Sequence, residues 1–332
     1  MEYVFFDIEC ACVYKETAKI CAFGYVLSDE NFNIIEKEDI LINPKGKFHL
    51  TDRKGKEGLV LPYDYEDFKK YPPFPRAYGK IRALLQGKDR LVFGHATSND
   101  VKYLNLETKR FSLPPLSYSF YDTQLLYMSM ISSFDHQYGL EGITKDLDVD
   151  FTPHRAADDA YATMRICEAM CKKAGVATAK ELIEKLCVLP GKTAGGRMVV
   201  GTSKAQREYR EEKRRQKEER EKIRAEFCAF VDRRRPKKKK AVKNGPFSGK
   251  VFAFSHDIEN NLSVSKDYID GVYRLGGNYI FRAEGCNVYV GGDESDRRRR
   301  NAEAAGAQIV DEAVFAAWIE RGDGSYETAR GG

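Results

Sequence analysis

Five residues at three places in the chain have side chains suited to metal-dependent chemistry. Asp7 and Glu9 follow a short apolar run, Asp100 lies far from them along the chain, and His154 precedes Asp159 by five positions. A carboxylate at the end of an apolar strand is costly to bury unless a partner compensates its charge. Several carboxylates at one point repel one another, and divalent cations relieve that repulsion. The pattern predicts a Mg²⁺ or Mn²⁺ site with a histidine at its edge, an arrangement suited to hydrolysis of a phosphodiester.

The ligand types favour two hard cations. On a regular strand Asp7 and Glu9 point to the same face, and Ile8 between them points into the core. We expect Asp100 and Asp159 on helices placed beside that strand end. Oxygen ligands select Mg²⁺ or Mn²⁺ over zinc. Two such ions about 4 Å apart can activate a water and stabilise the leaving oxygen. The histidine before Asp159 is of the right type to accept the water's proton near neutral pH.

Polar residues next to these positions are expected to be structural. Asp158 is interpreted as serving the start of a helix, because the spacing from the histidine favours Asp159 as the ligand. Asp122 is expected to cap the helix that follows a strand at 118–121. His95 is interpreted as a structural residue, with a contact to substrate as the alternative.

The same residues form three motifs that resemble those of the DEDDh exonucleases. That family includes the proofreading subunit of the bacterial replicative polymerase, ribonuclease T and oligoribonuclease. Over residues 1–175 the resemblance implies a ribonuclease H-like fold and 3′→5′ removal of nucleoside monophosphates from DNA or RNA. It also implies that four acids bind two metal ions and that His154 is the general base. The motifs are, in chain order, Asp7-x-Glu9, His95-x4-Asp100 and His154-x4-Asp159.

Two positions depart from the family's usual pattern. The first motif usually continues with Thr-Thr-Gly, which contacts the terminal nucleotide, whereas here Cys10, Ala11 and Cys12 follow. The residue after the second-motif histidine is usually Asn and is Ala96 here. These changes leave the metal ligands intact and leave the substrate preference open. We expect backbone groups of Cys10 and Ala11 to hold the 3′ end of the substrate.

The segments that must position these residues alternate between strand-like and helix-like patterns. An antiparallel hairpin is expected around a turn at 28–31. Residues 44–75, rich in Lys, Tyr, Phe and Pro, either line a nucleic-acid groove or form a plain surface excursion. The order of elements predicts an α/β fold in which a mixed sheet is flanked by helices. Strands are expected at 4–6, 20–27, 34–42, 91–94 and 118–121. One helix is expected to close over 82–85 and end near Gly87, a second to start near Ser98, a third to follow the last strand through Met130, and a fourth to span 158–173.

A basic segment separates this region from the rest of the chain. Residues 201–240 hold 17 Lys and Arg and 8 Asp and Glu, a net charge of +9, so the remainder of the +5 chain has −4. Ser203 and Gln206 have capping-box spacing before a long charged helix. The cations around Pro236 are expected to be disordered and to attract phosphates, with a solubilising hinge as the alternative.

Residues 247–322 return to a globular composition with alternating strands and helices, and this module is similar to a BRCT domain. The resemblance implies a phosphate contact by Ser255 and Arg298, at a helix N-terminal turn that favours anions. The alternative is a solvated basic turn without a ligand. Trp318 is expected in the core. The resemblance rests on Gly249–Ser255, Gly276 and Gly277, Cys286–Gly292, Ala302 to Gly306, and Phe315 with Trp318.

Length and composition fit two domains joined by a linker. We expect an exonuclease domain at 1–178, a basic helical linker at 179–246, a BRCT domain at 247–322 and a tail at 323–332. The 332 residues hold no apolar run long enough for a membrane span, and the N-terminus lacks signal-peptide features. Eight cysteines without a C-x2-C pair indicate free thiols in a reducing, cytoplasmic setting rather than a zinc site.

Two functions are compatible with these patterns. The first is a metal-dependent 3′-5′ exonuclease that acts on single-stranded or frayed nucleic-acid ends, with a BRCT module for targeting and a phosphate-bearing partner for that module. The second is a nucleic-acid or phosphoprotein adaptor whose nuclease fold has lost turnover. DNA versus RNA, the BRCT ligand and the oligomeric state stay open at this point.

Overall fold

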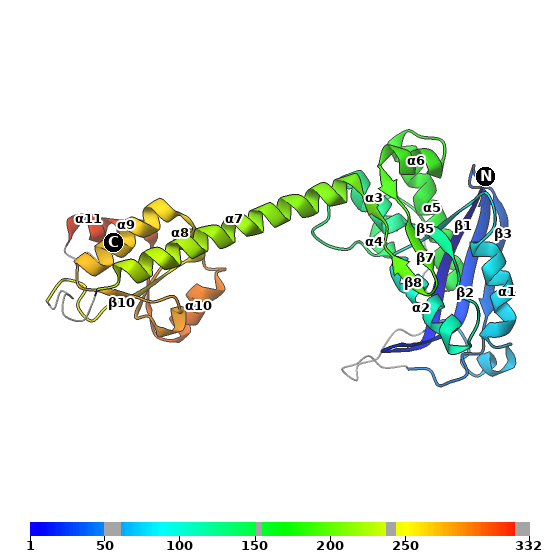
Figure 1. Cartoon of the computed structure of the whole chain (residues 1–332), viewed down its shortest axis with the longest axis horizontal. Coiled ribbons are helices and arrows are strands. Elements are labelled where there is room, and N and C mark those ends of the chain that lie inside the picture. The colour runs from blue at the N-terminus through cyan, green and yellow to red at the C-terminus, as the bar shows by residue number, and fades with distance from the viewer. Residues whose placement is uncertain (50–60, 151–154, 237–243, 323–332) are drawn as a thin grey trace. The chain divides into compact units, whose positions relative to one another are not determined.

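The computed structural model describes residues 1–49, 61–150, 155–236 and 244–322. The chain divides into two compact units, Met1–Glu211 and Glu212–Gly332 (Figure 1). None of the helices in the described ranges combines the length and apolar character that a membrane span requires.

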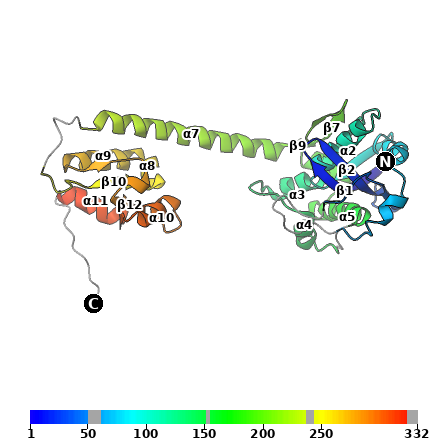
Figure 2. The ribbon, with the colours of Figure 1, turned by 90° about the horizontal axis from the view of Figure 1, so that it is seen from below.

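The first unit is built on a seven-stranded mixed sheet with the strand order β3-β2-β1-β4-β5-β7-β8. Helices lie on both sides of its strands β1 and β2 (Figure 2). Strands β1, β2 and β3 are antiparallel, β1, β4 and β5 run parallel, and β7 and β8 add antiparallel strands beside β5. The predicted hairpin and mixed sheet are confirmed. The strands are β1 Glu2–Tyr14, β2 Thr17–Asp29, β3 Ile34–Leu41, β4 Arg90–Gly94, β5 Tyr118–Asp122, β7 Gly191–Ala194 and β8 Arg197–Val199.

Alternation along β1 divides the core of this unit into two layers. Val4 and Phe6 belong to one buried cluster with helices α1 and α2, and Tyr3 and Phe5 belong to the other with α3, α4, α5 and α6. Odd-numbered residues of β1 therefore face α5. The helices are α1 Phe74–Leu85, α2 Ser98–Arg110, α3 Thr123–Ile131, α4 Leu140–Asp146, α5 Ala156–Ala174 and α6 Ala179–Lys185, and a short 3₁₀ helix, η1, spans Asp67–Lys70.

The first unit extends beyond the expected boundary at residue 178. Strands β7 and β8 complete its large sheet, and β6 (Val188–Leu189) pairs with β9 (Thr202–Ser203) in a separate small sheet. These strands have two to four residues each, which is too short to produce a periodic pattern in the sequence. Likewise, β1 was predicted to end at its acids but continues to Tyr14, because pairing with β2 satisfies its backbone beyond them.

Helix α7 (Lys204–Arg234) is the predicted charged helix. Gln206 donates its backbone N–H to Ser203 Oγ at 3.0 Å, as the capping-box spacing predicts. Most of the helix is exposed, but Phe227 and Val231 are buried in the core of the second unit. This part of the helix therefore belongs to the second unit, because its two apolar residues pack in that core.

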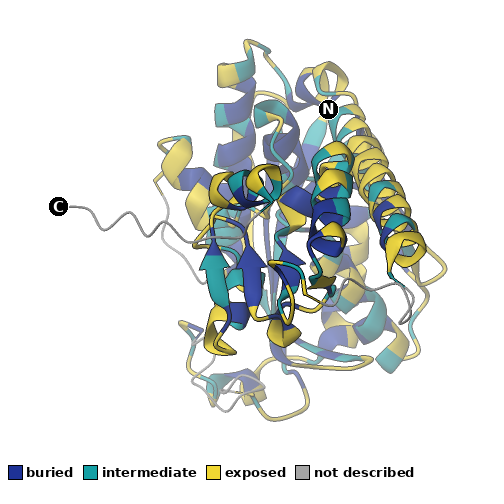
Figure 3. Ribbon diagram, turned by 90° about the vertical axis from the view of Figure 1, so that its left-hand side faces the viewer, coloured by how far each residue is buried: buried dark blue, intermediate teal, exposed yellow. Residues whose placement is uncertain are grey.

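The second unit has a four-stranded parallel sheet with the order β11-β10-β12-β13. Its strands are largely buried, and helices with exposed outer sides cover them (Figure 3). Trp318 packs against Phe315 and Phe247 in the core, as predicted. The elements are β10 Val251–Phe254, α8 His256–Asn260, α9 Leu262–Arg274, β11 Asn278–Tyr279, η2 Ala283–Gly285, β12 Val288–Val290, α10 Arg297–Ala304, β13 Gln308–Val310 and α11 Glu312–Arg321.

Candidate active site

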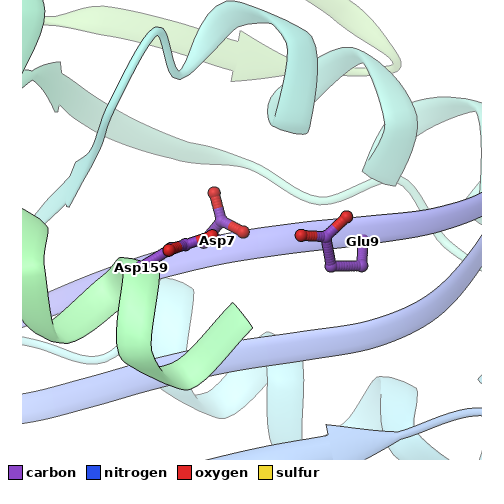
Figure 4. A group of neighbouring side chains, drawn as sticks. All are labelled: Asp7, Glu9 and Asp159. Carbon is purple, nitrogen blue, oxygen red and sulfur yellow. The ribbon is translucent and has the colours of Figure 1, made fainter. Parts of the chain in front are cut away.

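Three of the predicted acids meet in the first unit. Asp7 and Glu9 project from β1 toward α5, and Asp159 projects from α5 toward them (Figure 4). One carboxylate oxygen from each lies within 4.8 Å of those of the other two, and all three side chains are partly buried. Oxygen atoms at this spacing can ligate one divalent cation, whose bonds to oxygen are about 2.0–2.6 Å long.

The cluster is electrostatically unfavourable as long as all its carboxyl groups are charged. Burial, followed by repulsion from Asp100, Glu9 and Asp159, raises the pKa of Asp7 well above its ordinary value. Burial, followed by Asp159 and Asp39, raises the pKa of Glu9 to about 8. A divalent cation is the compensation that the donor set fits, because every donor is a carboxylate oxygen.

Asp100 approaches this cluster from the other side of the sheet end. It lies in the first turn of α2 and is 7% exposed. It is not one of the three closely spaced acids, yet after burial its charge contributes most to the raised pKa of Asp7. Burial and repulsion from Asp122 and Glu9 raise the pKa of Asp100 itself. The structure thus brings all four predicted acids into one electrostatic neighbourhood.

A glycine allows α5 to come close enough for Asp159 to reach β1. Gly24 on β2 is the register partner of Asp7. A Cβ at this position would lie 1.9 Å from the carbonyl carbon of Ala156 and 2.1 Å from the nitrogen of Ala157. Any side chain at Gly24 would therefore push the N-terminus of α5 away from the sheet and separate Asp159 from Asp7.

Two residues that the sequence analysis missed fix the same helix terminus. Asp39 on β3 accepts a hydrogen bond from Ala157 N–H at 2.7 Å, and the hydroxyl of Tyr63 accepts one from Ala156 N–H at 3.2 Å. Tyr63 also donates to Asp39 at 3.4 Å. Together they satisfy N–H groups that the first turn of a helix leaves unpaired. No local spacing indicates this role, because β3 contains three acids at 36, 38 and 39.

Asp122 has a wider role than the cap predicted for it. It accepts from Gln124 N–H at 2.9 Å, which confirms the cap on α3. It also accepts from the N–H groups of Ala96 at 3.0 Å and Thr97 at 3.2 Å, immediately before α2. Ala96 has a φ of +49°, a conformation that Asn adopts more readily than Ala. Asp122 therefore holds the turn that leads to Asp100.

His95 is tied into the fold, which favours the structural interpretation over a substrate contact. Its Nδ1 lies 3.2 Å from Thr123 Oγ1, and its Nε2 lies 3.1 Å from the carbonyl oxygen of Tyr138. Burial lowers the pKa of His95 to about 4. Both ring nitrogens thus have partners within the first unit. His154, the predicted general base, lies outside the described residues.

The segment after Glu9 departs from a regular strand. Register shifts with β2 lie between Glu9 and Cys10 and between Cys10 and Cys12, and bulges of this kind often redirect a strand next to an active site. Cys10 is partly buried. Ala11 is buried, and its carbonyl oxygen accepts from His49 N–H at 2.8 Å. That carbonyl is therefore engaged within the fold, and the expected contact of Cys10 and Ala11 with a 3′ end stays a prediction.

Asp158 and the aromatic segment 44–75, which the sequence analysis placed near the site, both have partners within the first unit. Asp158 forms an ion pair with Lys37 at 2.7 Å and is not one of the clustered acids, as expected. The described part of the aromatic segment 44–75 packs into a small core with Ala11 and Cys21. Its aromatic members there are Phe48, Tyr63, Tyr65 and Phe68.

In the second unit, the predicted phosphate contacts have internal partners. Ser255 Oγ accepts from Ile258 N–H at 3.3 Å and caps α8. Arg298 Nη2 donates to Glu259 Oε1 at 3.0 Å and to the carbonyl oxygen of Phe281 at 2.7 Å. Both residues thus have contacts within the second unit, and the phosphate contact expected of Arg298 and Ser255 stays a prediction. The buried carboxylate of Glu259 needs a cation and engages the guanidinium.

Several solved structures resemble this chain, all at low sequence identity. A full-length 3′-exonuclease is 15% identical over 60% of this chain and 89% of that chain, with a TM-score of 0.46. A 3′-exonuclease that recognises the histone mRNA stem-loop is 14% identical over 61% and 71%, with a TM-score of 0.47. E. coli exonuclease I in complex with a dA16 oligonucleotide is 15% identical over 55% and 42%, with a TM-score of 0.42.

Two comparisons of the sequence itself complement those of the structure. A search of curated protein sequences gives no match. The family model RNase_T, described as "Exonuclease", matches residues 4–167, which include α2 and most of β1 and α5. This range contains all four acids described above. Residues 4–167 therefore form an exonuclease domain of the DEDDh, ribonuclease T-like family of 3′-5′ exonucleases.

Proposed function

We propose that this domain removes nucleoside 5′-monophosphates from the 3′ ends of single-stranded or frayed nucleic acids by two-metal hydrolysis. Asp7, Glu9, Asp100 and Asp159 would hold two Mg²⁺ or Mn²⁺ ions. The observation that supports this most strongly is the convergence of three carboxylates within 4.8 Å, with the charge of Asp100 nearby. The chemistry that such ions supply is activation of a water and stabilisation of the leaving oxygen.

Residues of the chain itself position the metal ligands and accept the proton of the attacking water. Gly24, Asp39 and Tyr63 position α5 and thereby Asp159, and Asp122 positions the turn before Asp100. We assign the general base to His154 from its place in the third DEDDh motif. An imidazole there would take the proton of the attacking water, and such proton transfer contributes about 10²–10⁴-fold to a rate.

The test is hydrolysis of 5′-labelled single strands of matched DNA and RNA sequence by the purified protein with Mg²⁺. We expect stepwise shortening, 5′-mononucleotide products, and loss of both in chelator. Asp7→Asn and His154→Gln should abolish most of the rate. Asp158→Asn, which alters the adjacent acid outside the cluster, should not. If Asp7→Asn digests the strands as fast as the unmodified protein, the proposed site is wrong.

We also propose that the second unit is a BRCT-like module that targets the enzyme. Its four parallel strands in the order β11-β10-β12-β13 and the buried Trp318 support this proposal. Because Ser255 and Arg298 have internal partners, we propose no phosphate site at those residues. A targeting role predicts that a chain ending at Glu211 keeps the kcat of the full chain on short oligonucleotides. A collapse of kcat would contradict it.

A further inference from the structure

We infer that the first unit contains a second contact for the substrate strand, separate from the acidic cluster. It is a cavity between α2, the turn joining β1 to β2, and the β7–β8 hairpin, and it binds the strand's phosphates about four to six nucleotides upstream of the 3′ end. The inference rests on the proposed function, because it places the 3′ end of the strand at the acids.

The cavity has a volume of about 820 Å³ and receives residues from all three elements. Helix α2 contacts β8, so the hairpin closes one side. Lys102, Asn105 and Lys109 lie three or four positions apart and form one stripe of α2 along the cavity. The opposite stripe, which includes Asp100 and Leu104, is buried against the sheet. On the lining stripe Lys102 and Lys109 are exposed and available to a ligand, whereas Asn105 is half-buried and hydrogen-bonded to Thr193 at 3.0 Å.

The charge of the lining favours a polyanion. Three exposed lysines, Lys15, Lys102 and Lys109, and one acid, Glu16, lie around the cavity, for a net charge of +2. Glu16 lies 3.6 Å from Lys109, but their side chains are 84% and 76% exposed. A pair this exposed stabilises the protein by about 1 kcal/mol or less, so a phosphate can replace the carboxylate.

The rest of the lining suits the other parts of a strand. Leu113, Pro115 and Met198 give an apolar surface for bases. Gly195 and Gly196, with φ of +58° and +74°, form the two-residue hairpin turn and place no side chain over the cavity. Thr108, also in the lining, has a buried hydroxyl with no hydrogen-bond partner among the described residues.

The distance from the acids to the cavity determines which nucleotides of the substrate would contact the cavity. From Asp100 to Lys109 the helix rises about 14 Å, at about 1.5 Å per residue. From Glu9 to Lys15 the strand spans about 20 Å, at about 3.3 Å per residue. A stacked strand has one phosphate per about 3.4 Å, so the cavity lies about four to six nucleotides from the acids. A trimer that occupies the acidic site does not reach it.

The experiment compares Lys102→Glu/Lys109→Glu with the unmodified protein on 5′-labelled single strands of 3 and 12 nucleotides. We expect KM for the 12-mer to rise at least about 10-fold with kcat unchanged, and KM for the trimer to stay the same. The slope of log KM against log salt should fall by about 1.4, since each lost phosphate contact on a single strand removes about 0.7. Glu16→Gln should act in the opposite direction and lower KM for the 12-mer.

The matched control is Lys145→Glu/Lys185→Glu, which reverses two exposed lysines on α4 and α6, the helices on the opposite face of the sheet. Equal losses on trimer and 12-mer, or no loss on either, would overturn the inference. Fluorescence anisotropy of a labelled 12-mer in chelator measures binding without hydrolysis, so it tests the cavity separately from the proposed function. Weaker binding by the α2 variant without any turnover by the unmodified protein would refute the hydrolysis and keep the cavity.

Discussion

Buried carboxylates have opposite kinds of charged neighbour in the two units of this protein. In the second unit, Glu259 accepts from Arg298 at 3.0 Å and from the hydroxyl of Tyr279 at 2.7 Å. Its other oxygen lies 3.2 Å from His256 Nδ1. In the first unit, burial and then repulsion from further carboxylates, Asp100 first, raise the pKa of Asp7.

The difference separates a structural acid from a functional one. Breaking a fully partnered ion pair costs stability, because it leaves a buried charge uncompensated. Carboxylates that face one another lower stability until a cation from outside joins them. A buried acid whose partners are other acids therefore indicates a ligand that the chain itself does not supply, and the same type of substitution should act with opposite sign at the two places.

The largest effect is expected from Asp7→Asn. Loss of one metal-ligating carboxylate should reduce kcat at least about 10³-fold, which corresponds to several kcal/mol of lost transition-state stabilisation. The same change removes repulsion within the cluster, so the first unit should unfold at a higher temperature in chelator. Hydrolysis rates with Mg²⁺ test the predicted loss of activity, and calorimetry in chelator tests the predicted gain in stability. A variant that is both inactive and less stable would contradict the contrast drawn here.

Glu259→Gln should show the converse behaviour. Removal of the charge leaves the half-buried Arg298 without its carboxylate and should destabilise the second unit by about 3 kcal/mol. Trp318 is the only tryptophan of the chain and lies in the core of that unit, so its fluorescence during denaturation reports this unit alone. The rate on a short oligonucleotide should stay unchanged at temperatures at which the variant is folded. An unchanged fluorescence midpoint would show that the ion pair contributes nothing.

Asp39→Ala sharpens the comparison, because the short contact of this acid is to the backbone N–H of Ala157 at 2.7 Å, while its cation, the exposed Arg155, lies farther away at 3.8 Å. Loss of its bond to Ala157 N–H should loosen the start of α5, and a displacement of Asp159 by about 1 Å costs about 10²-fold in rate. We expect kcat to fall about 10- to 100-fold with KM for short strands nearly unchanged. Asp39→Asn keeps an acceptor oxygen and should recover most of the rate. Equal losses in both variants would indicate that charge, not position, is the function of Asp39.

The last prediction concerns pH. The pKa of Glu9 is raised from 4.5 to about 8 in the folded protein. Between these values the folded state holds a proton that the unfolded chain has released, so in chelator the stability of the first unit should fall as the pH rises through this window. Mg²⁺ should remove the fall, because it replaces the proton. Calorimetry at pH 5, 6.5 and 8 tests this, with Trp318 fluorescence as the Mg²⁺-independent control. Stability that rises with pH in chelator would contradict it.

Local pattern was sufficient for the main elements and the ligand types. The apolar runs predicted β2, β3, β4 and β5, the turn residues predicted the β2–β3 hairpin, and motif spacing separated Asp159 from Asp158. These properties depend on residues close together in the chain, where periodicity and residue type are informative. Short strands such as β7 and β8 gave no pattern, since their stability comes from pairing with β5.

Relations across the fold could not be predicted in the same way. The choice of Asp39 over Glu36 or Glu38 as the anchor of α5 depends on which residue of β3 lies under Ala157. The engagement of Arg298 by Glu259 depends on how α8 and α10 pack, and no local pattern indicates it. The sequence by itself determined which residues can ligate a hard cation and which segments are strands or helices. Only the tertiary structure decided which acids face one another and which face a cation, because electrostatic energy depends on distance in space rather than on separation along the chain.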